Sequence, residues 1–206
     1  MIELLSTSCP VMLWVITIAE ALFTVLLFSR YFKRKNLIFL LSGLICVGLT
    51  YDALILALGS FLREGTLLMA LSRVRYVLHG SLIPLIFLIC AYALNFKGAW
   101  MKAAWVFTGV LVALGIAEGS IRVIGVEMAA GICRYASVSA PAWAEIVNGL
   151  LTFGTVIPLM IAGIVVWVKQ KTPHLFLAGF LMFLFSGLGA ACLELMFYIS
   201  MYGELL

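Results

Sequence analysis

Six long apolar segments limit the folds that are open to this chain. They cover residues 10–28, 37–61, 67–94, 103–123, 146–168 and 175–201. A helix needs about 20 mostly apolar residues to cross the hydrocarbon core of a bilayer. In that core a chain segment has to satisfy its own backbone hydrogen bonds, which favours helices. The sequence therefore predicts an all-α, polytopic integral membrane protein with six transmembrane helices.

The composition supports a single membrane domain. The 206 residues are 65% hydrophobic and only 11% charged, whereas a soluble domain is about half apolar and a quarter charged. We therefore expect residues 1–206 to form one transmembrane domain whose main partner is the lipid bilayer. The start Met1-Ile2-Glu3 lacks the basic region of a cleavable signal peptide, so we expect the first apolar run to remain as a helix.

The third apolar segment is the least regular one, because Arg73 and Arg75 interrupt its first half. In a five-helix alternative, residues 67–79 form a re-entrant or surface segment. Pro84 further along removes a backbone hydrogen bond, so a bend is predicted near it.

The distribution of basic residues predicts the orientation of the helices. The first, third and fifth turns hold most of them, namely Arg30, Lys33, Arg34, Lys35, Lys97, Lys102, Lys169 and Lys171. The alternate turns hold Arg63 and Arg134, with Arg122 at a helix end. Cytoplasmic loops are rich in Lys and Arg. The pattern places both termini on the non-cytoplasmic side of the cell membrane, and it explains the net charge of +4 without a nucleic-acid partner.

Ionisable residues within the apolar segments are the first candidates for function. An ionised side chain at the centre of a bilayer costs about 2.5 kcal/mol or more, so it usually faces a partner, water or a ligand. The residues are Glu20, Asp52, Arg73, Arg75, His79, Glu118 and Glu194. At about 1.5 Å of rise per residue, all of them fall in the outer half or near the midplane. This common depth predicts one polar chamber that opens to the outside above an apolar inner half. The alternative is a structural network of ion pairs.

Helical spacing separates the two arginines of the third segment. Arg75 and His79 are four residues apart and share a face, and Tyr76 lies three residues before His79. Arg73 lies about 200° around the helix from Arg75, so we expect it to contact a different neighbour. We therefore interpret Arg75 as the ligand-facing arginine. The predicted ligand-binding set is Glu20, Asp52, Arg75, Tyr76, His79, Glu118 and Glu194.

Three classes of function fit this pattern. A carrier for a small anionic or zwitterionic solute would use Glu20 or Asp52 to exchange protons and Arg75 to hold the solute. An intramembrane enzyme acting on a lipid or isoprenoid headgroup at the outer leaflet would use His79, Asp52 and Glu118 as catalytic groups. A receptor, a homo-oligomer or a subunit of a membrane complex would need the chamber only for binding or structure. The carrier is the leading interpretation, although the apolar inner half suits an enzyme that needs only one opening.

The sequence contains no pattern of a cofactor or metal enzyme. CxxC, HExxH, GxSxG and P-loop motifs are absent from it. A zinc site would rest on His79 as its single histidine, so we expect neither a metal nor a cofactor. Cys9 and Cys133 both fall on the predicted outer side, where a disulfide between them is a further hypothesis.

Overall fold

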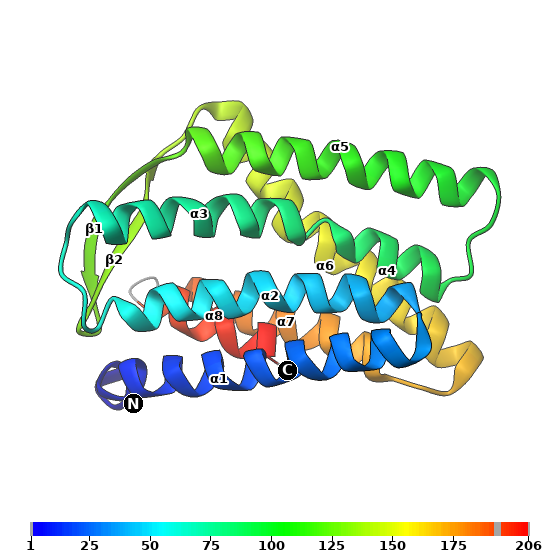
Figure 1. Ribbon diagram of the computed structural model, residues 1–206, viewed down its shortest axis with the longest axis horizontal. Helices are drawn as coiled ribbons and strands as arrows, with labels where there is room; N and C mark the ends of the chain where they lie inside the picture. The colour runs from blue at the N-terminus through cyan, green and yellow to red at the C-terminus, as the bar shows by residue number, and fades with distance from the viewer. Residues whose placement is uncertain (1, 192–194, 206) are drawn as a thin grey trace.

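The computed structural model is a bundle of long helices with a β-hairpin across one end (Figure 1). It describes residues 2–191 and 195–205. Within this part of the chain, six helical spans are long and apolar enough to cross a membrane: Thr7–Arg34, Leu37–Leu58, Thr66–Ala93, Ala99–Ile121, Ala142–Gln170 and His174–Ala191. The predicted class, a helical multi-pass membrane protein, is confirmed.

The first two helices form an antiparallel pair. Helix α1 (Ile2–Arg34) and helix α2 (Leu37–Leu58) are joined by the short turn Lys35–Asn36. Lys35 has a positive φ of 50°, and the Asn36 side chain accepts a hydrogen bond from the Ile38 amide at 2.9 Å, which caps α2. The pair packs along its length, which places Asp52 of α2 toward the interior of the bundle.

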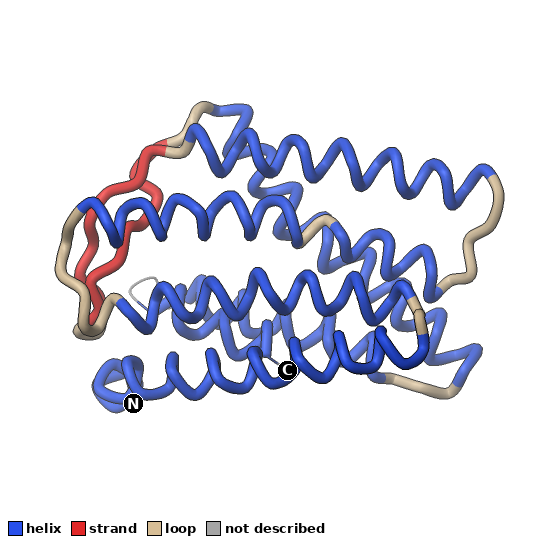
Figure 2. The backbone as a smooth tube through the Cα atoms, in the orientation of Figure 1, coloured by secondary structure: helices blue, strands red, loops and turns tan. Residues whose placement is uncertain are grey.

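The third apolar segment forms two helices in sequence, α3 (Thr66–Leu82) and α4 (Leu85–Ala93). The break at Ile83–Pro84 appears in Figure 2 as a short non-helical segment. Proline has no amide hydrogen to donate, so the α-helical pattern is interrupted where the bend was predicted. Helix α3 packs against both α2 and α5, inside the bundle. Residues 66–93 also form one of the six spans that are long and apolar enough to cross a membrane, which favours six spans over the five-helix alternative.

Helices α3 and α5 (Ala99–Ile121) touch through their backbones. A Cβ atom added to Gly115 would lie 1.9 Å from the carbonyl oxygen of Gly80, and one added to Gly119 would lie 2.7 Å from that of Tyr76. The pair Gly115 and Gly119 is thus a small-xxx-small packing motif. This close approach holds the arginine-bearing helix α3 against α5.

Strands β1 (Val123–Ala129) and β2 (Ile132–Ser139) form an antiparallel hairpin that the sequence analysis did not predict. Its two turn residues, Ala130 and Gly131, have positive φ angles of 51° and 75°, as a type I′ turn requires. Glu127 lies opposite Arg134, and the two side chains pair at 2.8 Å. The predicted all-α fold therefore gains a two-stranded element.

The hairpin lies across the ends of α2 and α3 (Figure 1). The Cys133 amide donates a hydrogen bond to the Gly59 carbonyl at 2.9 Å, and a Cβ atom on Gly59 would lie 2.1 Å from the Cys133 oxygen. Ile132 is fully buried in a cluster with Cys9 and Leu13. Cys9 and Cys133 are both buried free thiols, so the proposed disulfide between them is wrong. Each packs as a small apolar side chain.

The last apolar segment was predicted as one span over residues 175–201, and this prediction is wrong in its second half. Helix α7 (His174–Ala191) follows α6 (Ala142–Gln170), and helix α8 (Met196–Leu205) then runs back along α7. Gly189 lies against Met196, whereas Gly203 lies against Leu181. Helix α8 therefore ends about halfway along the bundle, and not at the end that carries the hairpin (Figure 1). A hydropathy profile does not distinguish one long transmembrane helix from a shorter helix followed by a short apolar helix that turns back.

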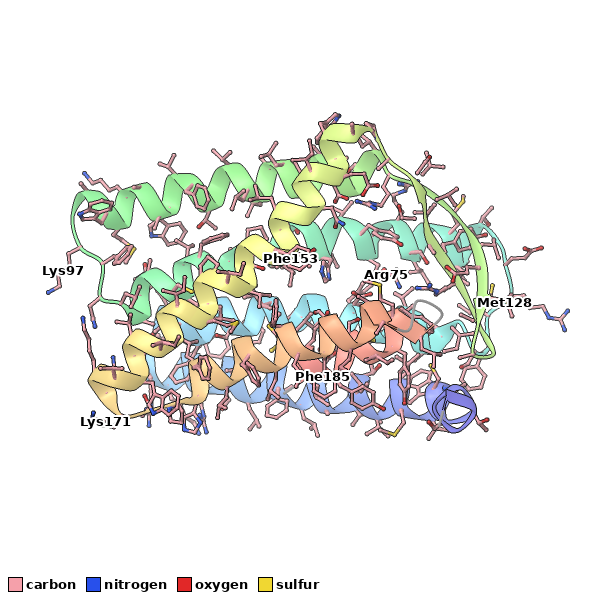
Figure 3. The ribbon with its side chains drawn as sticks, turned by 180° about the vertical axis from the view of Figure 1, so that it is seen from behind. Arg75, Lys97, Met128, Phe153, Lys171 and Phe185 are labelled. Atoms are coloured by element: carbon pink, nitrogen blue, oxygen red, sulfur yellow. The ribbon has the colours of Figure 1, made fainter. Side chains whose placement is uncertain are left out.

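The two ends of the bundle differ in charge. Figure 3 shows Lys97 and Lys171 at one end and Met128 of the hairpin at the other. The turns that carry the basic residues thus lie at one end, called the basic end below. In the half toward this end the helices pack around an apolar cluster that includes Leu41, Ile45, Leu49, Ile86, Leu88, Ile89 and Leu159.

Candidate functional site

A polar cavity of about 230 Å³ lies among helices α2, α3, α5, α6, α7 and α8. Figure 3 shows Arg75, which borders it, in the half of the bundle that carries the hairpin. The polar residues that line the cavity are Asp52, Arg75, Tyr76, His79, Glu118, Asn148, Thr152, Thr155, Ser186 and Glu204. A cavity with this lining contrasts with the apolar cluster toward the basic end.

Asp52 is the centre of the charged group in this cavity. Its Oδ1 atom lies 3.1 Å from Nε of Arg75, and its Oδ2 atom lies 3.3 Å from Nδ1 of His79. The side chains of Arg75 and Asp52 are only 9% and 16% exposed. One carboxylate from α2 therefore pairs with two side chains from a single face of α3, as the spacing of four residues allows.

His79 lines the cavity and keeps 42% of its side-chain surface accessible. A carboxylate can only accept a hydrogen bond, so Nδ1 of His79 has to carry the hydrogen that points to Asp52. In the neutral imidazole this leaves Nε2 as an acceptor. The pair can therefore bind a donor group of a ligand or take up a proton from it.

Tyr76 connects the cavity to the hairpin. Its ring centroid lies 4.9 Å from the guanidinium carbon of Arg75 and 5.9 Å from that of Arg122. Its hydroxyl group donates to the carbonyl oxygen of Tyr135 on β2 at 3.4 Å. Tyr76 therefore contacts both an arginine of the cavity and a strand of the hairpin.

Glu118 lies at the cavity wall but is already paired. It forms a buried ion pair with Arg122, four residues later on the same chain. Arg122 also donates to the Ser137 hydroxyl at 2.8 Å and lies 3.7 Å from Glu145. This network ties the end of α5 to β2 and to the start of α6, so we interpret Glu118 as mainly structural.

The structure separates Arg73 from the cavity. Its guanidinium donates to the backbone carbonyl oxygens of Ser120, at 3.3 Å, and of Arg122. These carbonyl groups lie at the end of α5, where no further amide of the helix is available to bind them. Arg73 therefore caps the end of α5, while Arg75 lines the cavity.

Glu204 is an ionisable cavity residue that was not among the predicted site residues. It comes from α8, and its Oε2 atom is buried with no hydrogen-bond partner among the described residues. The predicted last span ended at residue 201, so Glu204 was assigned to the outside. Once α8 is known to run back along α7, its last turn falls at the depth of the cavity.

Glu20 of α1 is buried at 2% exposure outside the cavity lining. Neither of its carboxylate oxygens has a hydrogen-bond partner in the described part of the chain. The remaining predicted site residue, Glu194, lies outside the described residues.

Comparison with known proteins adds no functional information: no family model matches the chain, and no curated protein matches it significantly. Among the described residues, no three His, Cys, Asp or Glu side chains converge as metal ligands.

Proposed function

We propose that this protein is a carrier whose polar cavity binds a small zwitterionic solute within the bilayer. The observation that carries this proposal is the convergence of Asp52, Arg75, His79 and Glu204, from three helices, on one cavity at membrane depth. Ionisable groups in that position are costly unless they serve a partner or a ligand.

The size of the cavity favours a small solute. Sites for drug-sized ligands usually have volumes of about 300–1,000 Å³, and this cavity has about 230 Å³. A solute of amino-acid size is consistent with that space, whereas a complete lipid would have to leave most of its length outside.

The charges favour a solute that carries both signs. Arg75 contacts Asp52 through Nε, and a guanidinium has two further nitrogens that can bind a carboxylate or phosphate. Glu204 offers a buried carboxylate oxygen without a hydrogen-bond partner among the described residues, which suits an ammonium group. An anionic solute without a positive group would bring another negative charge toward Glu204.

The two halves of the bundle support an opening to the non-cytoplasmic side. The basic turns mark the cytoplasmic end under the positive-inside rule, and the cavity lies in the half that carries the hairpin. The apolar cluster lies between the cavity and the basic end. A carrier with this arrangement has to rearrange to release its solute toward the cytoplasm.

A break in one helix and the end of another beside the cavity are consistent with such a rearrangement. Ile83, at the break between α3 and α4, lines the cavity, and Glu204 lies in the last turn of the returning helix α8. Carriers often place their substrate sites at discontinuous helices of this kind.

An intramembrane enzyme is the second candidate, and the pair of His79 and Asp52 is the observation that favours it. With Nδ1 directed to Asp52, the imidazole resembles a general base held by a carboxylate. A single opening to the outside would suffice for an enzyme, so the apolar cluster would present no obstacle.

A ligand screen followed by uptake measurements tests the proposal. Thermal unfolding of the purified protein is measured with amino acids and with short carboxylic acids, and stabilising compounds are then tested for uptake into proteoliposomes. A ligand at 100 times its Kd stabilises a protein by about 2.7 kcal/mol. We expect zwitterions to stabilise the protein and to accumulate inside the vesicles. Stabilisation without uptake would contradict the carrier, and chemical conversion of the compound would support the enzyme.

A further inference from the structure

A second cavity, distinct from the polar one, lies toward the basic end among α4, α5 and α6. It is an apolar groove of about 400 Å³. Its lining includes Phe87, Phe96, Trp100, Phe107, Pro158 and Ile161. The rings of Phe87 and Phe107 pack edge to face with centroids 5.0 Å apart, and the Trp100 side chain is 74% exposed.

The groove is short enough along the helices to fit within one leaflet of a bilayer. Its α5 residues, Trp100 to Phe107, belong to the first turns of a helix that begins at Ala99 at the basic end. Seven residues of helix cover about 10 Å, which fits within half of a hydrocarbon core of about 30 Å. Water has few hydrogen-bond partners in such an apolar groove, whereas an acyl chain can make van der Waals contacts with the apolar side chains that line it.

Chain adjacency and helical geometry place two lysines just beyond the lining of this groove, toward the basic end. Lys97 directly follows Phe96, which lines the groove. Lys169 lies seven residues beyond Ala162, which also lines it, on nearly the same face of α6 and about 10 Å further along. Both lysines are exposed. Lys102, in contrast, lies about 200° around α5 from Trp100 and therefore points away from the groove.

We propose that this groove is a binding site for an anionic glycerophospholipid of the leaflet at the basic end. One acyl chain lies in the groove between α5 and α6, and the phosphate lies between Lys97 and Lys169. The charge complementarity argues for this occupant, because basic sites between transmembrane helices on the cytoplasmic side attract anionic headgroups. A helix from a second copy would fill the apolar groove without using the two lysines. This inference does not depend on what the polar cavity binds.

Native mass spectrometry of the delipidated protein tests the site. Phosphatidylglycerol and phosphatidylcholine with identical acyl chains are added separately, and the fraction of protein that retains one lipid is measured. We expect phosphatidylglycerol to be retained preferentially. The double variant Lys97→Gln with Lys169→Gln should weaken its retention by roughly 30-fold, on about 1 kcal/mol for each lysine. The matched double variant Lys33→Gln with Lys102→Gln removes two charges from the same end of the bundle, away from the groove, and should retain the lipid as the unmodified protein does.

A second pair of variants tests the groove itself. Ala103→Phe places a ring in the groove, while Ala113→Phe places the same ring on another exposed part of α5. Only Ala103→Phe should lower phosphatidylglycerol retention, with both variants unfolding at similar temperatures. The proposal would be overturned if the protein retained both lipids equally, or if both pairs of lysine variants lost phosphatidylglycerol equally. It would also be overturned if the protein formed a dimer that Ala103→Phe abolishes.

Discussion

Nδ1 of His79 lies 3.3 Å from Oδ2 of Asp52, so the imidazole is oriented by an acid from the neighbouring helix. The same acid pairs with Arg75 through its other oxygen. Removal of any one of the three groups therefore changes the electrostatic environment of the other two, and variants at these positions separate the functional alternatives.

The first prediction concerns His79→Gln. For a carrier, we expect solute binding to fall less than about tenfold, because the glutamine amide can still donate to Asp52 and the cavity keeps its other polar groups. Binding is measured by calorimetry and transport by uptake into proteoliposomes. A general base contributes about 10²–10⁴-fold to a rate. A loss of that size in chemical turnover, with binding retained, would favour the enzyme.

The second prediction compares two variants of Arg75. Arg75→Leu should destabilise the protein by about 3 kcal/mol or more, because Asp52 loses its charged partner in a buried place. Arg75→Lys keeps the charge but loses the planar fork that grips a carboxylate. It should unfold near the normal temperature and bind the solute at least tenfold more weakly. If the Arg75→Lys variant bound the solute as tightly as the unmodified protein, Arg75 would act only through its ion pair with Asp52.

The third prediction concerns Glu20, whose two carboxylate oxygens lack hydrogen-bond partners among the described residues. For a proton-coupled carrier, Glu20→Gln should mimic the proton-loaded state. Solute binding should persist with a flatter dependence on pH, while uptake driven by a pH gradient should stop. Glu64→Gln, at an exposed position between α2 and α3, is the matched control, with unchanged uptake expected. Normal coupled uptake in Glu20→Gln would remove Glu20 from the mechanism.

The fourth prediction tests the contact between α3 and α5. Gly115→Ala would place a Cβ atom 1.9 Å from the Gly80 carbonyl oxygen, so the helices would have to move apart. Overpacking of this kind costs about 1–3 kcal/mol. Gly109→Ala on the same helix meets no atom within 4 Å and should be neutral or stabilising by up to about 1 kcal/mol. Thermal unfolding in detergent measures both, and equal effects would contradict the packing argument.

The fifth prediction tests the orientation in the membrane. Met128→Cys, at an exposed hairpin position, should react with an impermeant thiol reagent added to intact cells, whereas Lys97→Cys at the basic end should not. Cys133 is only 6% exposed, so its own labelling should be weak. Labelling of the Lys97 variant alone would reverse the assignment of the two sides.

The sequence was sufficient for features that depend on local pattern. Continuous apolar runs define the spanning helices, and the 200° between Arg73 and Arg75 follows from helical geometry alone. Pro84 also predicts the break between α3 and α4, since the effect of proline on a helix is local.

Features that depend on contacts between distant segments were missed. The hairpin pairs Val126 with Tyr135 through the turn Ala130-Gly131, which lacks the Asn-Gly or Asp-Gly of the most recognisable hairpins. The return of α8 brings Glu204 to the cavity through packing on α7, which hydropathy does not report. The site was therefore predictable on α2 and α3 but not on α8.

The pairing of Asp52 with residues of α3 bears on how the protein enters the membrane. Helices α2 and α3 are consecutive, so the acid and its two basic partners leave the ribosome within a stretch of fewer than thirty residues. If both helices enter together as a hairpin, Asp52 can be neutralised by Arg75 during insertion itself. Synthesis of α2 without α3 should accordingly make its integration less efficient. The ion pair would then have two roles, because it lines the cavity in the folded protein and helps the nascent chain to insert into the membrane.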